Sequence, residues 1–205
     1  MDQQETAGKG GGKLAARDLV TVGIFTALYL VFMMVGGAFF APNPVLTFWM
    51  PAAVALLTGP IYLLLIAKVP KHGPLIVVGV VEGLFLFATG MYWGWAMACV
   101  VLGIAVDIIA GIGRFRSKAL NFTAFVVYSL SPMGSYLMLW ANPTGYASYL
   151  VGKGAEQAYM DTMMSTATDW MLPAMVLATV ACAIISGLLG MRLLHRQFEK
   201  AGITA

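Results

Sequence analysis

The chain has 205 residues, of which 60% are hydrophobic and 10% are charged, with a formal net charge of +3. Soluble domains usually carry about 25% charged residues, and a soluble core cannot hide this much apolar surface, whereas a bilayer can. The basic residues stand in short clusters between apolar runs, not on one face, which excludes nucleic acid as a partner. The composition predicts an all-α protein of the membrane.

The chain begins with a polar, glycine-rich stretch, residues 1–13, which predicts a disordered cytoplasmic tail. The first apolar run is long and has no small-residue cleavage site, so we expect it to stay as a membrane anchor. Residues 14–196 are expected to form one six-helix transmembrane domain, and residues 197–205 a second cytoplasmic tail.

Six apolar stretches approach the length of about 20 residues that a helix needs to cross the hydrocarbon core. We expect them at about Leu19–Phe40, Val45–Ala67, Pro74–Thr89, Trp93–Ile112, Leu120–Trp140 and Trp170–Leu194. The third is the shortest. The longest connection, 141–169, contains a stretch, 154–168, that predicts a short amphipathic helix. Long connections with their own structure usually form lids or binding loops.

The basic residues indicate the orientation, because Lys and Arg accumulate on the cytoplasmic side of a membrane. With the N-terminus inside and six spans, Lys153 is the one basic residue left outside. The inner set is Lys9, Lys13, Arg17, Lys68, Lys71, Arg114, Arg116, Lys118, Arg192, Arg196 and Lys200. We therefore predict a multi-pass protein of the cell membrane with both termini in the cytoplasm.

Tryptophan and methionine both favour the outer side of this topology. The five tryptophans at expected outer helix ends are Trp49, Trp93, Trp95, Trp140 and Trp170. Of the fourteen methionines, all except Met1 and Met191 fall in outer loops or outer helix halves. Interfacial anchoring and ordinary apolar packing each explain one bias. Together the two biases also fit an outward-facing, apolar and aromatic cavity, and both interpretations stay open.

Two acids lie inside apolar runs, where an ionisable side chain is a functional candidate. Glu82 is near the middle of the third span, where a ligand, a proton or a neighbouring helix are its alternative partners. Asp107 is close to an inner boundary, so we expect it to contact a helix end or a nearby cation of the segment 114–118. His72 and His195 are expected to anchor inner helix ends.

The chain lacks the motifs of serine hydrolases, zinc proteases and phosphate-binding loops, so we expect neither an enzyme nor a metal or cofactor site. Cys99 and Cys182 are expected to be reduced residues within the apolar runs. Small residues four apart recur on three spans, as Gly23 and Ala27, Gly79 and Gly83, and Ala183 and Gly187. Such pairs let helices approach closely, either inside the bundle or against a partner.

Several short stretches resemble the S components of energy-coupling factor (ECF) transporters, and in particular the Trep/Strep-type (MptD-like) group. They are Arg17–Ala27 at the first span, Asp107–Gly111 with Gly113–Lys118 and Asn121 after the fourth, and the aromatic outer loop before the sixth. The likeness extends from about Leu14 to Arg196.

The resemblance implies a six-helix, S-component-like bundle that binds a micronutrient near its outer face. Partners would be an ECF T subunit and two ATPase subunits. The family contacts its T subunit through an Ala-x-x-x-Ala pattern on the first helix, where this chain has Gly23 and Ala27. We assign partner contact to these two residues and to Ala183 and Gly187. The start Met1-Asp2 departs from the Met-His start of nickel and cobalt S components, which disfavours that branch.

The expected outer segments carry few charges, which favours a neutral, aromatic or amphipathic cargo. We expect Tyr92, Trp93 and Trp95 to stack on it. Further expected substrate contacts are Trp49, Glu82, Asn142, Tyr146 and Tyr149. Two alternatives remain: an intramembrane enzyme acting on a lipid or isoprenoid with Glu82 and Asp107 as acid and base, and a membrane scaffold subunit.

Overall fold

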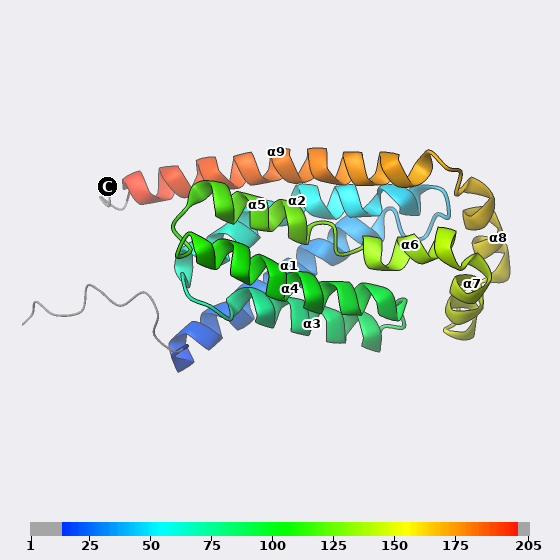
Figure 1. Ribbon diagram of the computed structural model, residues 1–205, viewed down its shortest axis with the longest axis horizontal. Coiled ribbons are helices and arrows are strands. Elements are labelled where there is room, and N and C mark those ends of the chain that lie inside the picture. The colour runs from blue at the N-terminus through cyan, green and yellow to red at the C-terminus, as the bar shows by residue number, and fades with distance from the viewer. Residues whose placement is uncertain (1–13, 201–205) are drawn as a thin grey trace, which may run out of the picture.

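A computed structural model describes residues 14–200 of the chain, and the side chains of residues 14–194. All regular structure in this range is helical (Figure 1). The elements are α1 (Ala16–Ala38), a short 3-10 helix η1 (Leu46–Trp49), α2 (Met50–Lys68), α3 (Pro74–Ala88), α4 (Trp93–Ile112), α5 (Lys118–Tyr128), α6 (Met133–Ala141), α7 (Pro143–Gly152), α8 (Gln157–Thr166) and α9 (Met171–Lys200). The predicted tail 1–13 and His195's side chain lie outside this description, whereas residues 197–200 continue α9.

Four helical stretches are long and apolar enough to cross a membrane: α1, η1 with α2, α4, and residues 171–194 of α9. Helices α5 and α6 pass the same test as a pair bent by 42°, which gives a fifth candidate. Helix α3 is apolar but has 15 residues, a rise of about 22 Å against a hydrocarbon core of about 30 Å. The all-helical membrane fold is confirmed, while the count of six spans and the orientation stay predictions.

The predicted fifth span is not one continuous helix, because the helix is interrupted between Tyr128 and Met133. Pro132 lies in this break, and proline has no N–H to donate to the preceding turn. The backbone there forms tighter bonds, such as that from Ser131 N to Tyr128 O at 2.9 Å. The sequence carried this signal in Ser129–Pro132, and its consequence is that α6 runs in a new direction across the bundle.

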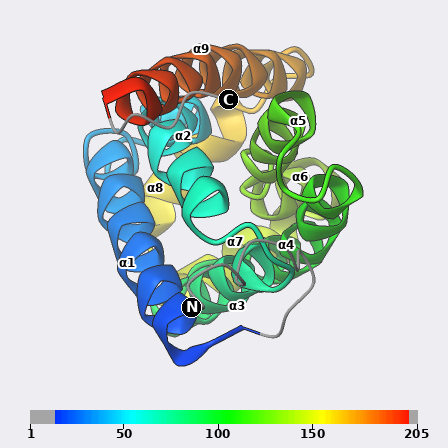
Figure 2. The same ribbon diagram turned by 90° about the vertical axis from the view of Figure 1, so that its left-hand side faces the viewer.

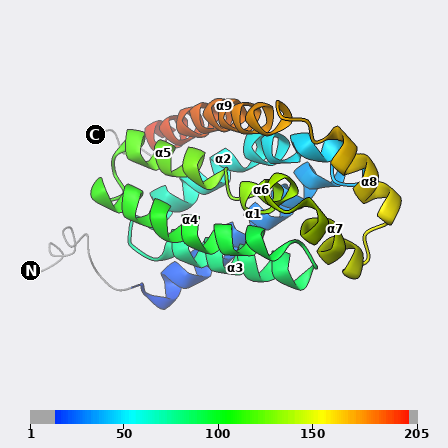
Figure 3. The same ribbon diagram turned by 45° about the vertical axis from the view of Figure 1, so that its right-hand side comes forward.

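The long helices form a closed ring. Helix α1 packs against α2 and α3, α3 against α4, α4 against α5, α5 against α9, and α9 against α2. The end-on view in Figure 2 shows this order. Figure 3 shows α7 and α8 gathered at one end of the elongated bundle, while α1 begins and α9 ends at the other.

Two buried clusters fill the interior. The first packs Tyr29, Tyr62, Phe125 and Tyr128 with aliphatic residues of α1 to α5 and α9. The second lies toward α7 and α8 and is rich in methionine and aromatic residues. Glycines bring the helices close: a Cβ on Gly79 would lie 3.1 Å from Gly103 Cα and in collision with Cys99 O of α4. The pair Gly79 and Gly83 therefore packs inside the bundle.

Candidate functional site

Helices α7 and α8 cover one end of the bundle, which we call the capped end. Helix α7 begins where the Asn142 side chain accepts a hydrogen bond from Gly145 N (3.0 Å), with Pro143 in the first turn. Proline is favoured there because the first helical N–H groups lack partners. Helix α8 lies within the stretch 154–168 that the sequence predicted to be helical. It buries Met160 and Met163, which are one turn apart on one face.

The capped end holds a group of seven buried methionines that share one apolar cluster with aromatic side chains. They are Met33, Met50, Met133, Met160, Met163, Met171 and Met175. They come from α1, α2, α6, α8 and α9 and gather at one end of the bundle, while the prediction that this end is the outer one stays untested. Thioether side chains are flexible and polarizable, and they form adaptable apolar walls. The cavity expected from the sequence stays a prediction.

Three tyrosines from two segments form an aromatic group within the capped end. The Tyr92 ring lies 5.1 Å from the rings of both Tyr146 and Tyr149 of α7. The Tyr146 hydroxyl shares a hydrogen bond of 3.3 Å with Ser135 of α6. Burial raises the pKa of Tyr146 to about 12, which keeps its hydroxyl neutral. The ammonium of Lys153 lies 5.8 Å from the centre of the Tyr149 ring.

The tryptophans divide into two groups that the sequence did not separate. Trp95 is 5% exposed, and its indole Nε1 is buried without a hydrogen-bond partner. The Nε1 of Trp140, in the same cluster, is also buried and unpartnered. Trp93 and Trp170 are exposed, at 48% and 60%. Trp49 packs partly buried against the cluster.

Of the eight residues predicted to contact substrate, the structure gathers Tyr92, Trp95, Tyr146, Trp49 and Tyr149 at the capped end. Trp93 is exposed beside Tyr92, and Asn142 is an exposed helix cap. Sequence reasoning did not include Trp140 among the substrate contacts and assigned no role to Tyr136. The Tyr136 hydroxyl donates to Thr47 O (2.7 Å) and so ties α6 to η1. The helical spacing of Met133, Tyr136 and Leu139, three positions apart, was the available signal, but the break at Pro132 hid it.

Helices α7 and α8 are also hydrogen-bonded to two connections, the one between α1 and η1 and the one between α3 and α4. The Tyr159 hydroxyl of α8 donates to Ala41 O at 2.7 Å, and the Tyr149 hydroxyl of α7 reaches Met91 O at 3.5 Å. These contacts join segments more than fifty residues apart. Apolar packing adds to these bonds, because Tyr146 and Ala147 of α7 and Met160 and Met163 of α8 are buried in the cluster at this end.

Glu82 lies deeper, at the centre of the bundle, and is 2% exposed. The Tyr128 hydroxyl donates to its Oε2 at 2.6 Å. The ring of Tyr62 stacks on that of Tyr128 at 5.3 Å, and Tyr29 lies edge-on to Tyr128 at 6.0 Å. The Tyr62 hydroxyl is buried without a partner. A neighbouring helix thus supplies a partner for Glu82, one of the alternatives that the sequence left open.

Asp107 contacts a helix end, as expected, but its side-chain partner is a histidine and not one of the predicted cations. Its Oδ1 accepts from Gly73 N at the start of α3 (3.0 Å), and its Oδ2 lies 2.8 Å from His72 Nδ1. Arg114 and Arg116 are exposed instead. The reason is that α4 packs against α3, which brings a residue 35 positions away nearer than the following turn.

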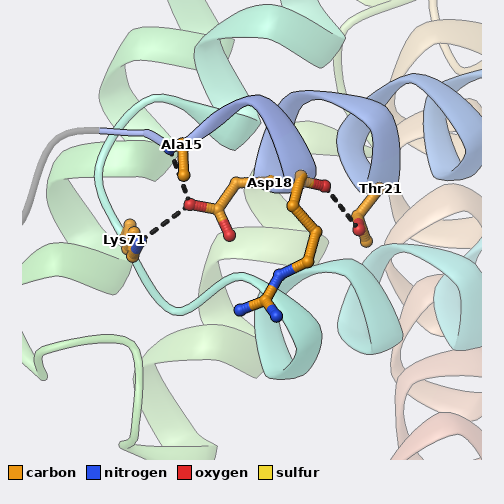
Figure 4. Close-up of polar contacts among 5 residues, drawn as sticks. Ala15, Asp18, Thr21 and Lys71 are labelled. Carbon is orange, nitrogen blue, oxygen red and sulfur yellow. Dashed lines mark hydrogen bonds and ion pairs between the residues drawn. The ribbon is translucent and has the colours of Figure 1, made fainter. Parts of the chain in front are cut away.

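The first turn of α1 is fixed to the loop between α2 and α3 (Figure 4). Asp18 Oδ2 accepts hydrogen bonds from Lys71 Nζ (2.7 Å) and from Ala15 N (2.9 Å). In the next turn the Thr21 hydroxyl donates to Arg17 O at 3.0 Å. These bonds lie in the stretch that resembles S components, and they fix where α1 starts.

The predicted partner-contact residues differ in exposure. Gly23 and Ala27 are exposed on α1, and a Cβ on Gly23 would have nothing within 4 Å. Ala183 and Gly187 of α9 are buried, and a Cβ on Gly187 would lie 2.6 Å from the Phe122 ring of α5. The α9 pair therefore serves packing inside the bundle, the other role that the sequence allowed.

The described residues thus define a helical integral membrane protein that crosses the bilayer several times and is capped at one end. Residues 16–200 match a family described as hypothetical bacterial integral membrane proteins (Trep_Strep). Because this match covers most of the chain, the protein belongs to that family. No curated protein and no solved structure matches the chain.

Proposed function

We propose that this protein is the substrate-binding S component of an ECF-type importer and captures a micronutrient at the capped end for ATP-driven uptake. One observation carries the proposal: a buried wall of methionines and aromatic rings holds two indole N–H donors, of Trp95 and Trp140, without acceptors. Buried donors in proteins nearly always have a partner. A bound molecule that enters under α7 and α8 is a suitable source of those acceptors.

The chemistry of the capped end favours a neutral, aromatic or amphipathic cargo. Thioether and aromatic side chains make most of its wall, and the cation of Lys153 is held over the Tyr149 ring. Aromatic walls with a few polar groups are typical of sites for small molecules. A strongly anionic cargo would instead require several cations directed at it.

In this proposal the capped end faces outward and the bundle crosses the membrane six times. Helix α3 and the bent pair α5–α6 each count as one crossing, and the ends rich in Lys and Arg are cytoplasmic. The partners are a T subunit and two ATPase subunits. The open surface around Gly23 and Ala27 supports contact through α1, since a second helix can approach there closely.

The enzyme alternative gains no support from the arrangement of the two acids. Asp107 of α4 accepts a hydrogen bond from Gly73 N at the start of α3. Glu82 lies nine residues after Gly73 on α3, so the two acids are separated by a helical rise of about 13 Å. A catalytic pair would need to meet at one substrate. We therefore propose a binding protein that does not itself catalyse a reaction.

Trp95→Phe and Trp140→Phe test this proposal, because each removes one N–H donor and keeps an aromatic ring. The protein is purified in mild detergent from its host's membranes, and extracted small molecules are quantified by mass spectrometry. We expect one compound to be retained at stoichiometric level and to fall about ten-fold in either variant, as for one lost hydrogen bond.

Trp170→Phe is the matched control, because the Trp170 side chain is exposed at the same end. It should retain the compound like the unaltered chain. The proposal is wrong if no compound is retained by any form, or if all three variants retain it equally while eluting as monodisperse protein.

A further inference from the structure

Three cations project from the turn that joins α4 to α5. Arg114, Arg116 and Lys118 are all exposed and stand at alternate positions of the chain. Neither of the two ion pairs found among the described side chains, Lys71 with Asp18 and His72 with Asp107, involves them. These three positive charges within five residues form a strongly cationic patch at one end of the bundle.

The turn is held in one shape by unusual backbone geometry. Arg114 and Phe115 have φ values of 51° and 59°, a left-handed conformation that non-glycine residues rarely adopt. The fold compensates on the inner side: Phe115 is buried and packs edge-on to His72 at 4.9 Å. Asn121 Nδ2 also donates to Phe115 O at 2.9 Å. With Phe115 directed inward, the flanking Arg114 and Arg116 are directed outward.

An apolar stripe leads along α4 directly to this turn. Val101, Ile104, Ile108 and Ile112 are exposed and follow one another at helical spacing, so they lie on one face. Ile112, the last residue of α4, is 72% exposed and stands two positions before Arg114. In a membrane this face contacts acyl chains, and the cations lie where headgroups begin.

We propose that the α4–α5 turn, together with the exposed stripe of α4, is a binding site for one anionic phospholipid. The acyl chains lie along the isoleucines, and Arg114, Arg116 and Lys118 bind the headgroup phosphate. Arginine suits this role because its planar group donates two parallel hydrogen bonds to phosphate oxygens. A soluble anion would gain nothing from the stripe, and an acidic protein surface would not extend along the acyl region.

The site fits a role in holding the bundle at a fixed depth. Helix α3, beside α4, is too short to cross a bilayer without local adjustment. A lipid held at the turn would fix the level of the headgroups next to it. Cationic clusters at membrane boundaries gain affinity for anionic lipids with each added Lys or Arg.

The test is lipid retention by the full chain, measured by native mass spectrometry after delipidation and addition of phosphatidylglycerol or phosphatidylcholine of identical acyl chains. We expect at least about a ten-fold preference for phosphatidylglycerol at one site. The triple variant R114Q/R116Q/K118Q should lose this preference. The control triple R17Q/K68Q/R192Q removes the same charge from exposed positions at the same end, and should keep it.

Equal retention of the two lipids by the unaltered chain would overturn the proposal. So would an equal loss in both triple variants, which would indicate a diffuse effect of net charge. Unchanged lipid preference in R114Q/R116Q/K118Q, with weakened capture of partner subunits, would assign the cations to a protein interface. Every variant is first compared by size-exclusion elution, so that a misfolded form is not counted.

Discussion

Gly79→Ala is expected to destabilise the protein by about 2–3 kcal/mol, the upper part of the range of about 1–3 kcal/mol found when atoms are forced into a filled interior. The added methyl would collide with the carbonyl oxygen of Cys99 and lie 3.1 Å from Gly103 Cα. Both obstacles are backbone atoms of α4, so α3 and α4 must separate. In thermal unfolding followed by intrinsic fluorescence in detergent, we expect the midpoint to fall by roughly 5–10 °C.

The matched control is Gly23→Ala on α1, where the same methyl would meet nothing within 4 Å. Alanine favours the helix over glycine by about 1 kcal/mol, so this variant should unfold at an equal or higher temperature. Equal losses in the two variants would contradict the close α3–α4 packing, because the effect would then come from glycine itself and not from its neighbours.

Breaking the bond between Glu82 and Tyr128 is the second change with a large expected effect. Glu82→Leu leaves the Tyr128 hydroxyl buried without its acceptor, and Tyr128→Phe leaves the carboxyl without its donor. An unsatisfied buried polar group costs about 1–3 kcal/mol, and more when it is charged. Each single variant should therefore unfold clearly below the unaltered chain.

The double variant, Glu82→Leu with Tyr128→Phe, removes both polar groups and should be less destabilised than the sum of the single changes. Glu82→Gln keeps an acceptor at the same place and serves as the control, with an expected small loss. Thermal unfolding of the unaltered chain, the two single variants and the double variant gives the coupling free energy between Glu82 and Tyr128 directly. Strictly additive losses would mean that the 2.6 Å contact contributes nothing to the folded state.

Much of the fold could be predicted from the sequence, because apolar length and helix-breaking residues are local properties. The boundaries of α4 were predicted to the residue, and the long outer connection was expected to contain a helix. The fifth span was wrong as a single helix because the apolar run concealed the effect of Pro132. The sequence also gave no means of deciding whether α3, at 15 residues, spans the membrane.

The site was harder to predict because it depends on which helices become neighbours. Tyr92, Trp95 and Tyr146 were expected at one end and lie there together. Small residues four apart look alike in the sequence, yet Gly23 is open to the surface while Gly187 faces the Phe122 ring. Which helix, if any, packs against a small-residue pair is decided by the tertiary fold, when the ring of helices closes.

If the chain is an importer subunit, it must also bind partner proteins. An S component must form a complex, and the exposed surface around Gly23 offers the place. Substituting Gly23→Leu adds a bulky side chain at an exposed position, where nothing lies within 4 Å of the Cβ position. It separates loss of partner contact from loss of folding.

The most direct test of the central claim is co-expression of the tagged chain with its host's T subunit and ATPases, followed by affinity purification in detergent. The account predicts that all three partners elute in stoichiometric amounts with the unaltered chain, and that Gly23→Leu elutes alone as a monodisperse protein. A chain that elutes alone in its unaltered form, under conditions in which an established S component captures the same partners, would contradict the claim.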